Sequence, residues 1–167
     1  MKFIDSLHDQ WQGVTGEDGP MPHPSPAADR LLTLAQWHAV RDHWPAGLNT
    51  GVLLPNDVDV ETLVDDLPKL GLVVLHFPKW TDGRAYSQAH LLRQRYRYTG
   101  QVRATGEVVV DMMPLLARTG FDAVQLRGDQ KQALAERALG FFDDGHYQGA
   151  VGETRPWFLR AGQAVQA

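Results

Sequence analysis

A short segment in the middle of the chain combines side chains that could bind an anion. The stretch from Pro78 to Arg84 holds two cations, Lys79 and Arg84, together with the hydroxyl of Thr81 and the carboxylate of Asp82. It lies between an apolar run and a predicted helix, whose first N–H groups have no partner within the helix and therefore favour anions. The alternative is that Asp82 caps this helix and that Arg84 forms a structural ion pair. These residues are candidates for binding a small anion or an acidic partner protein.

Two further charged residues belong to the same candidate site. Arg103 stands between two apolar residues of a predicted strand, so part of its side chain should be buried. A buried arginine needs a partner carboxylate, and Asp82 and Glu107 are the candidates. Together with Lys79 and Arg84, Arg103 would clamp a small anion. Glu107 is the candidate general base of an enzyme acting on such an anion, because a base has to come within hydrogen-bond reach of the substrate.

Several kinds of chemistry have no residues here to support them. The chain has no cysteine, which excludes disulfides, thiol nucleophiles and cysteine-ligated zinc or iron–sulfur sites within it. The seven histidines make no metal-binding motif; His38 and His43, for example, are five residues apart, a spacing that does not place them on one helical face. A nucleophile elbow, a Walker loop and a dinucleotide fingerprint are all missing. We therefore expect no metal site, and no cofactor is evident.

Charge is distributed unevenly along the chain. The net charge is −4, yet residues 79–106 hold six cations against one acid, a local charge of +5 that leaves −9 for the rest. An acidic body with one basic segment argues against a nucleic-acid-binding protein. It is compatible with a local site for an anion or for an acidic partner.

Size and hydropathy indicate a single domain. A chain of 167 residues, 43% of them hydrophobic, is long enough for one sizeable core. No apolar run approaches the ~18 residues that span a bilayer, and the N-terminus lacks the apolar region of a signal peptide. We expect a cytoplasmic protein without membrane contact.

The elements that position the candidate site alternate between strands and helices. Five apolar runs predict strands at residues 30–34, 51–55, 71–77, 101–105 and 121–126. Helices are predicted between them, beginning near Asp59, Asp82 and Asp111 among others. Such strands indicate an α/β fold of about five mostly parallel strands, built of successive βα units with helices on both faces. The same succession allows a half-barrel-like βα array, closed by dimerisation.

The predicted domain is flanked by two segments of different character. Residues 1–29 form an N-terminal arm and a loop rich in proline and glycine, residues 30–148 form the single α/β domain, and residues 149–167 form a C-terminal tail. Residues 71–77 are the most apolar strand and should be central. Because ligands bind beyond the carboxyl ends of parallel strands, this position would deliver residues 78–84 to the ligand crevice.

A resemblance to a known family covers most of the chain. It rests on Thr81-Asp82-Gly83-Arg84, on Arg103-Ala104 and on Arg118-Thr119-Gly120-Phe121-Asp122, and it extends upstream to residues 9–11. These strings resemble a bacterial family of unknown function whose genes commonly lie beside those for sirohaem sulfite reductase and related sulfate-assimilation enzymes. Members are often labelled as oxidoreductases without a settled reaction. Residues 149–167 look like an addition to the family core.

The resemblance implies a pathway rather than catalytic residues. It predicts an accessory protein of assimilatory sulfate and sulfite reduction, which binds or assists the sulfite reductase, its electron donor or another sulfate-assimilation protein. One alternative is a protein or enzyme that binds a sulfur oxyanion or a phosphoester through Lys79, Arg84 and Arg103. A third is a flavin or nicotinamide oxidoreductase, which no phosphate-binding loop supports. Whether the protein is a catalyst is left open.

Overall fold

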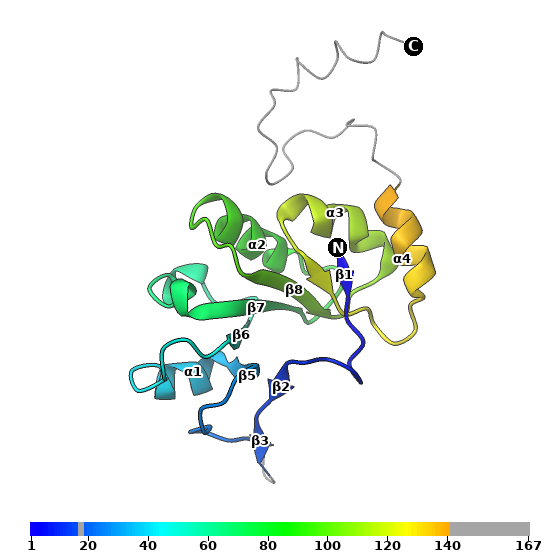
Figure 1. Ribbon diagram of the computed structural model, residues 1–167. Helices are drawn as coiled ribbons and strands as arrows, with labels where there is room; N and C mark the ends of the chain where they lie inside the picture. The colour runs from blue at the N-terminus through cyan, green and yellow to red at the C-terminus, as the bar shows by residue number, and fades with distance from the viewer. Residues whose placement is uncertain (17–18, 141–167) are drawn as a thin grey trace.

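The computed structural model describes residues 1–16 and 19–140, which form an α/β fold around one parallel sheet (Figure 1). The strands lie in the order β1-β9-β8-β7-β6-β5-β2, and every neighbouring pair is parallel. Their bounds are β1 Lys2–Phe3, β2 Gln12–Gly13, β5 Arg30–Thr33, β6 Thr50–Leu54, β7 Leu70–Phe77, β8 Gln101–Gly106 and β9 Ala123–Val124. A small antiparallel hairpin, β3 Thr15–Gly16 with β4 Gly19–Pro20, stands apart from this sheet.

Four α-helices occur in the described residues, and three of them connect consecutive strands. They are α1 Leu34–Val40, α2 Arg84–Gln94, α3 Met113–Thr119 and α4 Gln132–Leu139. Between β6 and β7 the chain makes two short 3-10 turns, η1 Val60–Leu63 and η2 Leu67–Lys69, and a third, η3 Val110–Met112, precedes α3. The helix predicted after Asp59 is therefore replaced by η1 and η2. Pro68 in η2 cannot donate an intrahelical hydrogen bond, which limits regular helix there.

The helices all pack on the same face of the sheet. One hydrophobic core joins Trp37 of α1, Leu92 of α2, Leu116 of α3 and Ala138 of α4 to alternate residues of the strands. Strands β5 to β9 follow one another both in sequence and in the sheet, and right-handed crossovers then leave every connection on one side. The prediction of helices on both faces is wrong in this respect. The α/β class and the parallel sheet are confirmed, and the curled sheet matches the half-barrel alternative.

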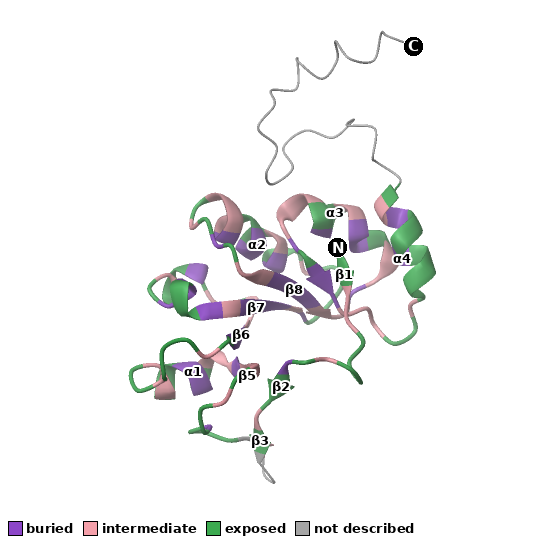
Figure 2. Cartoon of the chain, in the orientation of Figure 1, coloured by how far each residue is buried: buried purple, intermediate pink, exposed green. Residues whose placement is uncertain are grey.

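The first residues of the chain cross the other, helix-free face. We call residues 1–13 the N-terminal belt: its β1 pairs with β9 at one edge of the sheet and its β2 pairs with β5 at the opposite edge. Between these edges Trp11, 8% exposed, packs against Leu72 and Val74 of β7. Its ring lies so close to Gly51 that a Cβ atom there would be 3.1 Å away. Figure 2 shows the resulting band of buried residues along the central strands.

All five strands predicted from apolar runs are present, although β9 is shorter than the predicted 121–126. The two edge strands of the belt were not predicted as part of the sheet, because strands of two residues carry no periodic pattern. The domain end at residue 148 and the tail 149–167 lie outside the described residues. Within the described residues, every helix is too short or too polar to cross a membrane.

Candidate functional site

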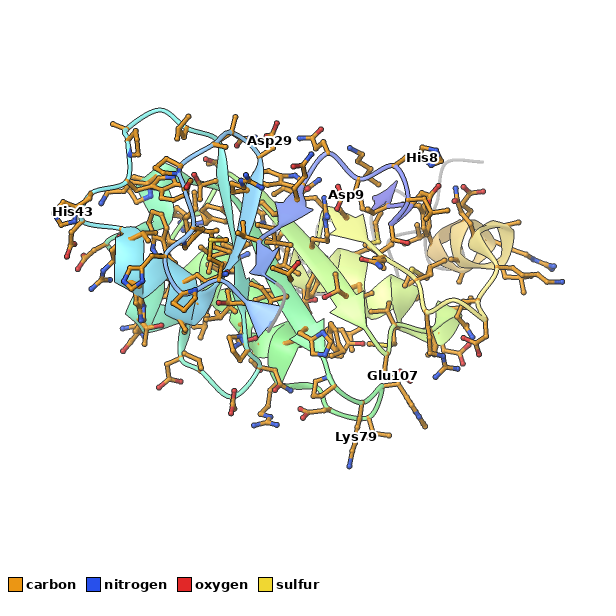
Figure 3. The ribbon with its side chains drawn as sticks, turned by 90° about the horizontal axis from the view of Figure 1, so that it is seen from below. His8, Asp9, Asp29, His43, Lys79 and Glu107 are labelled. Atoms are coloured by element: carbon orange, nitrogen blue, oxygen red, sulfur yellow. The ribbon has the colours of Figure 1, made fainter. Side chains whose placement is uncertain are left out.

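The loops that follow the strands meet at the carboxyl edge of the sheet. The backbone N–H of Glu107 donates to the carbonyl of Phe77 at 2.8 Å, so the loop after β8 lies against the loop after β7. Figure 3 shows Lys79 and Glu107 at this same edge. The predicted gathering of these loops at one edge is therefore present in the structure.

Asp82 and Arg84 neutralise each other within the loop after β7. The guanidinium of Arg84 donates from Nε to Oδ1 of Asp82 at 3.0 Å and from Nη2 to Oδ2 at 2.7 Å. These hydrogen bonds hold the pKa of Asp82 far below its usual range. Gly83 occupies the N-cap position of α2, one residue later than predicted, but Oδ1 of Asp82 accepts from the backbone N–H of Arg84, the first residue of the helix, at 3.3 Å. The alternative prediction, that Arg84 forms a structural ion pair, is confirmed.

Three consecutive residues of this loop are left facing solvent. Lys79 and Thr81 are exposed, and Trp80 between them is 59% exposed. Lys79 makes no ion pair with any residue in the described part of the chain. The N–H of Asp82 donates to the carbonyl of Lys79 at 3.0 Å, which closes the loop into a turn. The sequence places an aromatic ring in this loop, but Trp80 was not among the predicted site residues. Its signal is a tryptophan that follows a strand-ending proline instead of lying in an apolar run.

Arg103 lies on the other face of the sheet. It is 2% exposed, which confirms its predicted burial, but its partner is Asp9 of the belt, neither Asp82 nor Glu107. Its Nη1 donates to Oδ2 of Asp9, and its Nη2 donates to Oδ1 of Asp9 at 3.2 Å. Successive strand residues point to opposite faces, so Arg103 faces the helix-free side, where the belt passes. In Figure 3 Asp9 lies well away from Lys79 and Glu107.

Glu107 belongs to a second ion-pair cluster at the carboxyl edge. Its Oε2 accepts from Nη1 of Arg127 at 2.8 Å. The same guanidinium donates from Nε to Oδ1 of Asp129 at 2.6 Å and from Nη2 to Oδ2 at 2.8 Å. These hydrogen bonds lower the pKa of Asp129 to about 2. The candidate general base thus has one carboxylate oxygen engaged by an arginine that sequence reasoning did not connect with it.

The structure brings together some of the predicted site residues and separates others. Lys79, Thr81, Asp82 and Arg84 share one loop and Glu107 lies on the next, but Arg103 is apart and the three-cation clamp is not formed. The basic segment is also largely neutralised internally. Arg93 donates to the carbonyls of Gly120 and Gly100, at 3.0 and 2.8 Å, and pairs with Asp122. Arg95 pairs with Glu61 at 3.2 Å.

A family model describes most of the chain. It matches residues 51–158, and its description is a bacterial protein of unknown function, DUF934. The chain belongs to this family. The matched region contains every residue of the predicted site and both ion-pair clusters, whereas Asp9 and the rest of the belt precede it. It also extends to residue 158, so the first part of the predicted tail belongs to the family region and is not an addition to it. No curated protein shows a significant match to the chain.

No described residues of the DUF934 chain form a metal site. Within residues 1–16 and 19–140 there is no group of three or more histidine, aspartate and glutamate side chains placed to hold a metal ion. What the carboxyl edge presents to solvent is an aromatic ring and a lysine on a closed turn, flanked by two internally paired clusters. This arrangement is suited to binding another molecule at a surface.

Proposed function

We propose that this protein is a cytoplasmic accessory protein of assimilatory sulfite reduction. It binds the sulfite reductase or the electron donor of that enzyme through the exposed turn after β7, which consists of Lys79, Trp80 and Thr81. The pathway comes from the gene neighbourhood that the family resemblance implies. The solvent exposure of the turn supports its choice as the binding surface.

The exposed ring of Trp80 carries the proposal. Tryptophan is the residue type most enriched among those that dominate binding energy at protein interfaces. Covering the exposed part of its ring, on the order of 100–150 Å², would contribute about 2.5–4 kcal/mol. Pairing of Asp82 with Arg84 fixes the base of the turn, so little conformational entropy is lost on binding.

The charges around the turn favour binding over catalysis. Arg84 and Arg127 are both occupied by carboxylates, so neither offers an unpaired cation to a small anion. Lys79 makes no ion pair with a described residue. A single lysine beside an aromatic ring would guide the approach of an acidic partner surface without forming an anion clamp.

The test measures association of purified sulfite reductase, and separately of its electron donor, with the wild-type chain by isothermal titration calorimetry. Trp80→Ala should weaken the association by about 60-fold to 700-fold, the equivalent of that 2.5–4 kcal/mol. Lys79→Glu should mainly slow the association rate, followed by stopped-flow fluorescence, and reduce the dependence of that rate on salt.

Two matched variants serve as controls. Leu134 on α4 is also a largely exposed hydrophobic residue, so Leu134→Ala should leave the affinity unchanged. Lys131 is an exposed lysine outside the turn, and Lys131→Glu should likewise have no effect. Equal losses in the control variants, or no association of the wild-type chain at low salt, would refute the proposal.

A further inference from the structure

A second surface feature lies beside the turn after β7 but does not include it. A cavity of about 240 Å³ opens between the connection that follows β6 and the first turns of α2. Asp57 and Asp59 line it from the connection, and Arg84, Ser87, Gln88 and Leu91 line it from α2. The sequence analysis did not predict this cavity, and it gave Asp59 only the role of beginning a helix.

The charge of the cavity is negative. Asp57 and Asp59 are exposed, and neither forms an ion pair with any described residue. Arg84 is neutralised by its two hydrogen bonds to Asp82. The remaining positive contribution is the amino end of α2, equivalent to roughly half a unit charge, which two carboxylates outweigh. A cation is therefore favoured there over an anion.

The wall of the cavity also holds an unfilled acceptor. Gln88 is only 6% exposed, and its Nε2 donates to the carbonyls of Pro55 at 2.8 Å and Val58 at 2.7 Å. Both amide hydrogens are thus used, which fixes the orientation of the side chain. Its Oε1 is buried and has no hydrogen-bond partner among the described residues. Leaving such an oxygen unpaired is unfavourable, and a positive charge held nearby would relieve it.

Part of the remaining lining is apolar, although the polar side chains of Asn56 and Ser87 also line the cavity. Val60 is buried and Leu91 is half-buried, and both line the cavity. We propose that this cavity binds an alkylammonium group, with its methylene chain against Val60 and Leu91 and its charge beside Asp57 and Asp59. Such a group is the side chain of a lysine on a partner protein or a free alkyl amine. The inference does not depend on the proposed role in sulfite reduction.

The test is an NMR titration of the folded, isotope-labelled chain with three probes. Nα-acetyl-lysine N-methylamide and pentylamine carry the ammonium group, and Nα-acetyl-norleucine N-methylamide carries only the apolar stem. Both charged probes should shift the signals of Ser87, the Gln88 side-chain amide and the backbone around Asp59 along saturable curves. The norleucine probe should not. Tighter binding of the lysine probe identifies a protein side chain as the ligand, and tighter binding of pentylamine identifies a free amine.

Matched variants test the charge directly. Asp57→Asn combined with Asp59→Asn should weaken binding of the charged probes by about tenfold or more. Asp65→Asn removes another exposed acid of the same connection, one that does not line the cavity, and should leave binding unchanged. Trp80→Ala should also leave it unchanged, which separates this site from the proposed function. Equal shifts with the norleucine probe, or equal binding by the doubly substituted chain, would overturn the inference.

Discussion

The arginines of residues 79–106 have different surroundings, which decide whether each one stabilises the fold or adds charge to the surface. Arg103 is buried against Asp9, whereas Arg97 is exposed and makes no ion pair with a described residue. The burial of Arg103 could be predicted from its apolar neighbours in the strand. Its partner could not, because 94 residues separate Arg103 from Asp9 and no local pattern connects them. The net charge of the segment likewise follows from the sequence. The sequence does not show that carboxylates elsewhere in the fold pair with most of these arginines, so that little of the charge is left unpaired at the surface.

Removing the Arg103 side chain should strongly destabilise the fold. Arg103→Ala leaves the carboxylate of Asp9 partly buried without its cation, a loss of about 3–5 kcal/mol. For a chain of this size the melting temperature should fall by roughly 6–20 °C. Arg97→Ala is the control and should change it by a degree or two at most. A comparable, small change in both variants would mean that Arg103 is solvated.

The second ion-pair cluster should be visible in the titration of Asp129. Arg127 lowers the pKa of this carboxyl to about 2 from an ordinary 3.8, so the pair stabilises the fold fully above pH 4. The stabilisation is lost as the pH falls towards 2. In Arg127→Gln the pKa of Asp129, followed by carbon NMR, should rise towards 3.8. Arg137→Gln on α4 should not change it. An unchanged pKa of Asp129 in Arg127→Gln would contradict the hydrogen bonding between Arg127 and Asp129.

At the level of elements, the end of β8 depends on a glycine. Gly106 has φ +93°, and a Cβ atom there would lie 2.4 Å from the carbonyl oxygen of Phe77. This close approach lets the N–H of Glu107 bond to the same carbonyl, which joins the loops after β7 and β8. The strands themselves could be predicted because continuous apolar runs mark buried parallel strands. This junction could not, since a lone glycine gives no indication of which backbone it approaches.

Gly106→Ala should therefore destabilise the carboxyl edge. The left-handed backbone alone costs about 1–2 kcal/mol with a side chain, and the contact with the carbonyl oxygen adds to this. Gly128→Ala is the matched control, because nothing lies within 4 Å of its Cβ position and its φ is not positive. Urea denaturation should give a loss of at least about 2 kcal/mol for the first variant and less than about 0.5 kcal/mol for the control. Similar values for the two would show that the loops adapt freely.

At the level of the whole molecule, the sheet is covered by helices on one face and by a single strap of chain on the other. The N-terminal belt reaches both edges of the sheet and places Trp11 over β7. Sequence patterns predicted the helices and the parallel strands but not which face each helix covers. Strand order decides that, and local periodicity does not specify strand order.

Trp11 should be one of the largest single contributors to stability. Trp11→Ala removes the ring from the helix-free face and should reduce the free energy of unfolding by about 3–5 kcal/mol. The same variant should increase the binding of a hydrophobic dye, because Leu72 and Val74 lose their cover. Trp80→Ala provides the comparison: its ring is mostly exposed, so stability should change by less than about 0.5 kcal/mol. If the two substitutions had equal effects, the belt would not be part of the core.

The belt also has a consequence for how the protein is made. Lys2 and Phe3 pair with Ala123 and Val124, so the first strand to be synthesised has to wait for the last strand of the sheet. At a translation rate of ~5–20 residues per second, that wait of about 120 residues lasts roughly 6–24 s. Leu72 and Val74, which lie beneath Trp11, are synthesised about 50 residues before β9, and over that interval the sheet still lacks its second edge strand. We expect the nascent chain to bind chaperones until β9 has emerged from the ribosome, and faster elongation should shorten that interval.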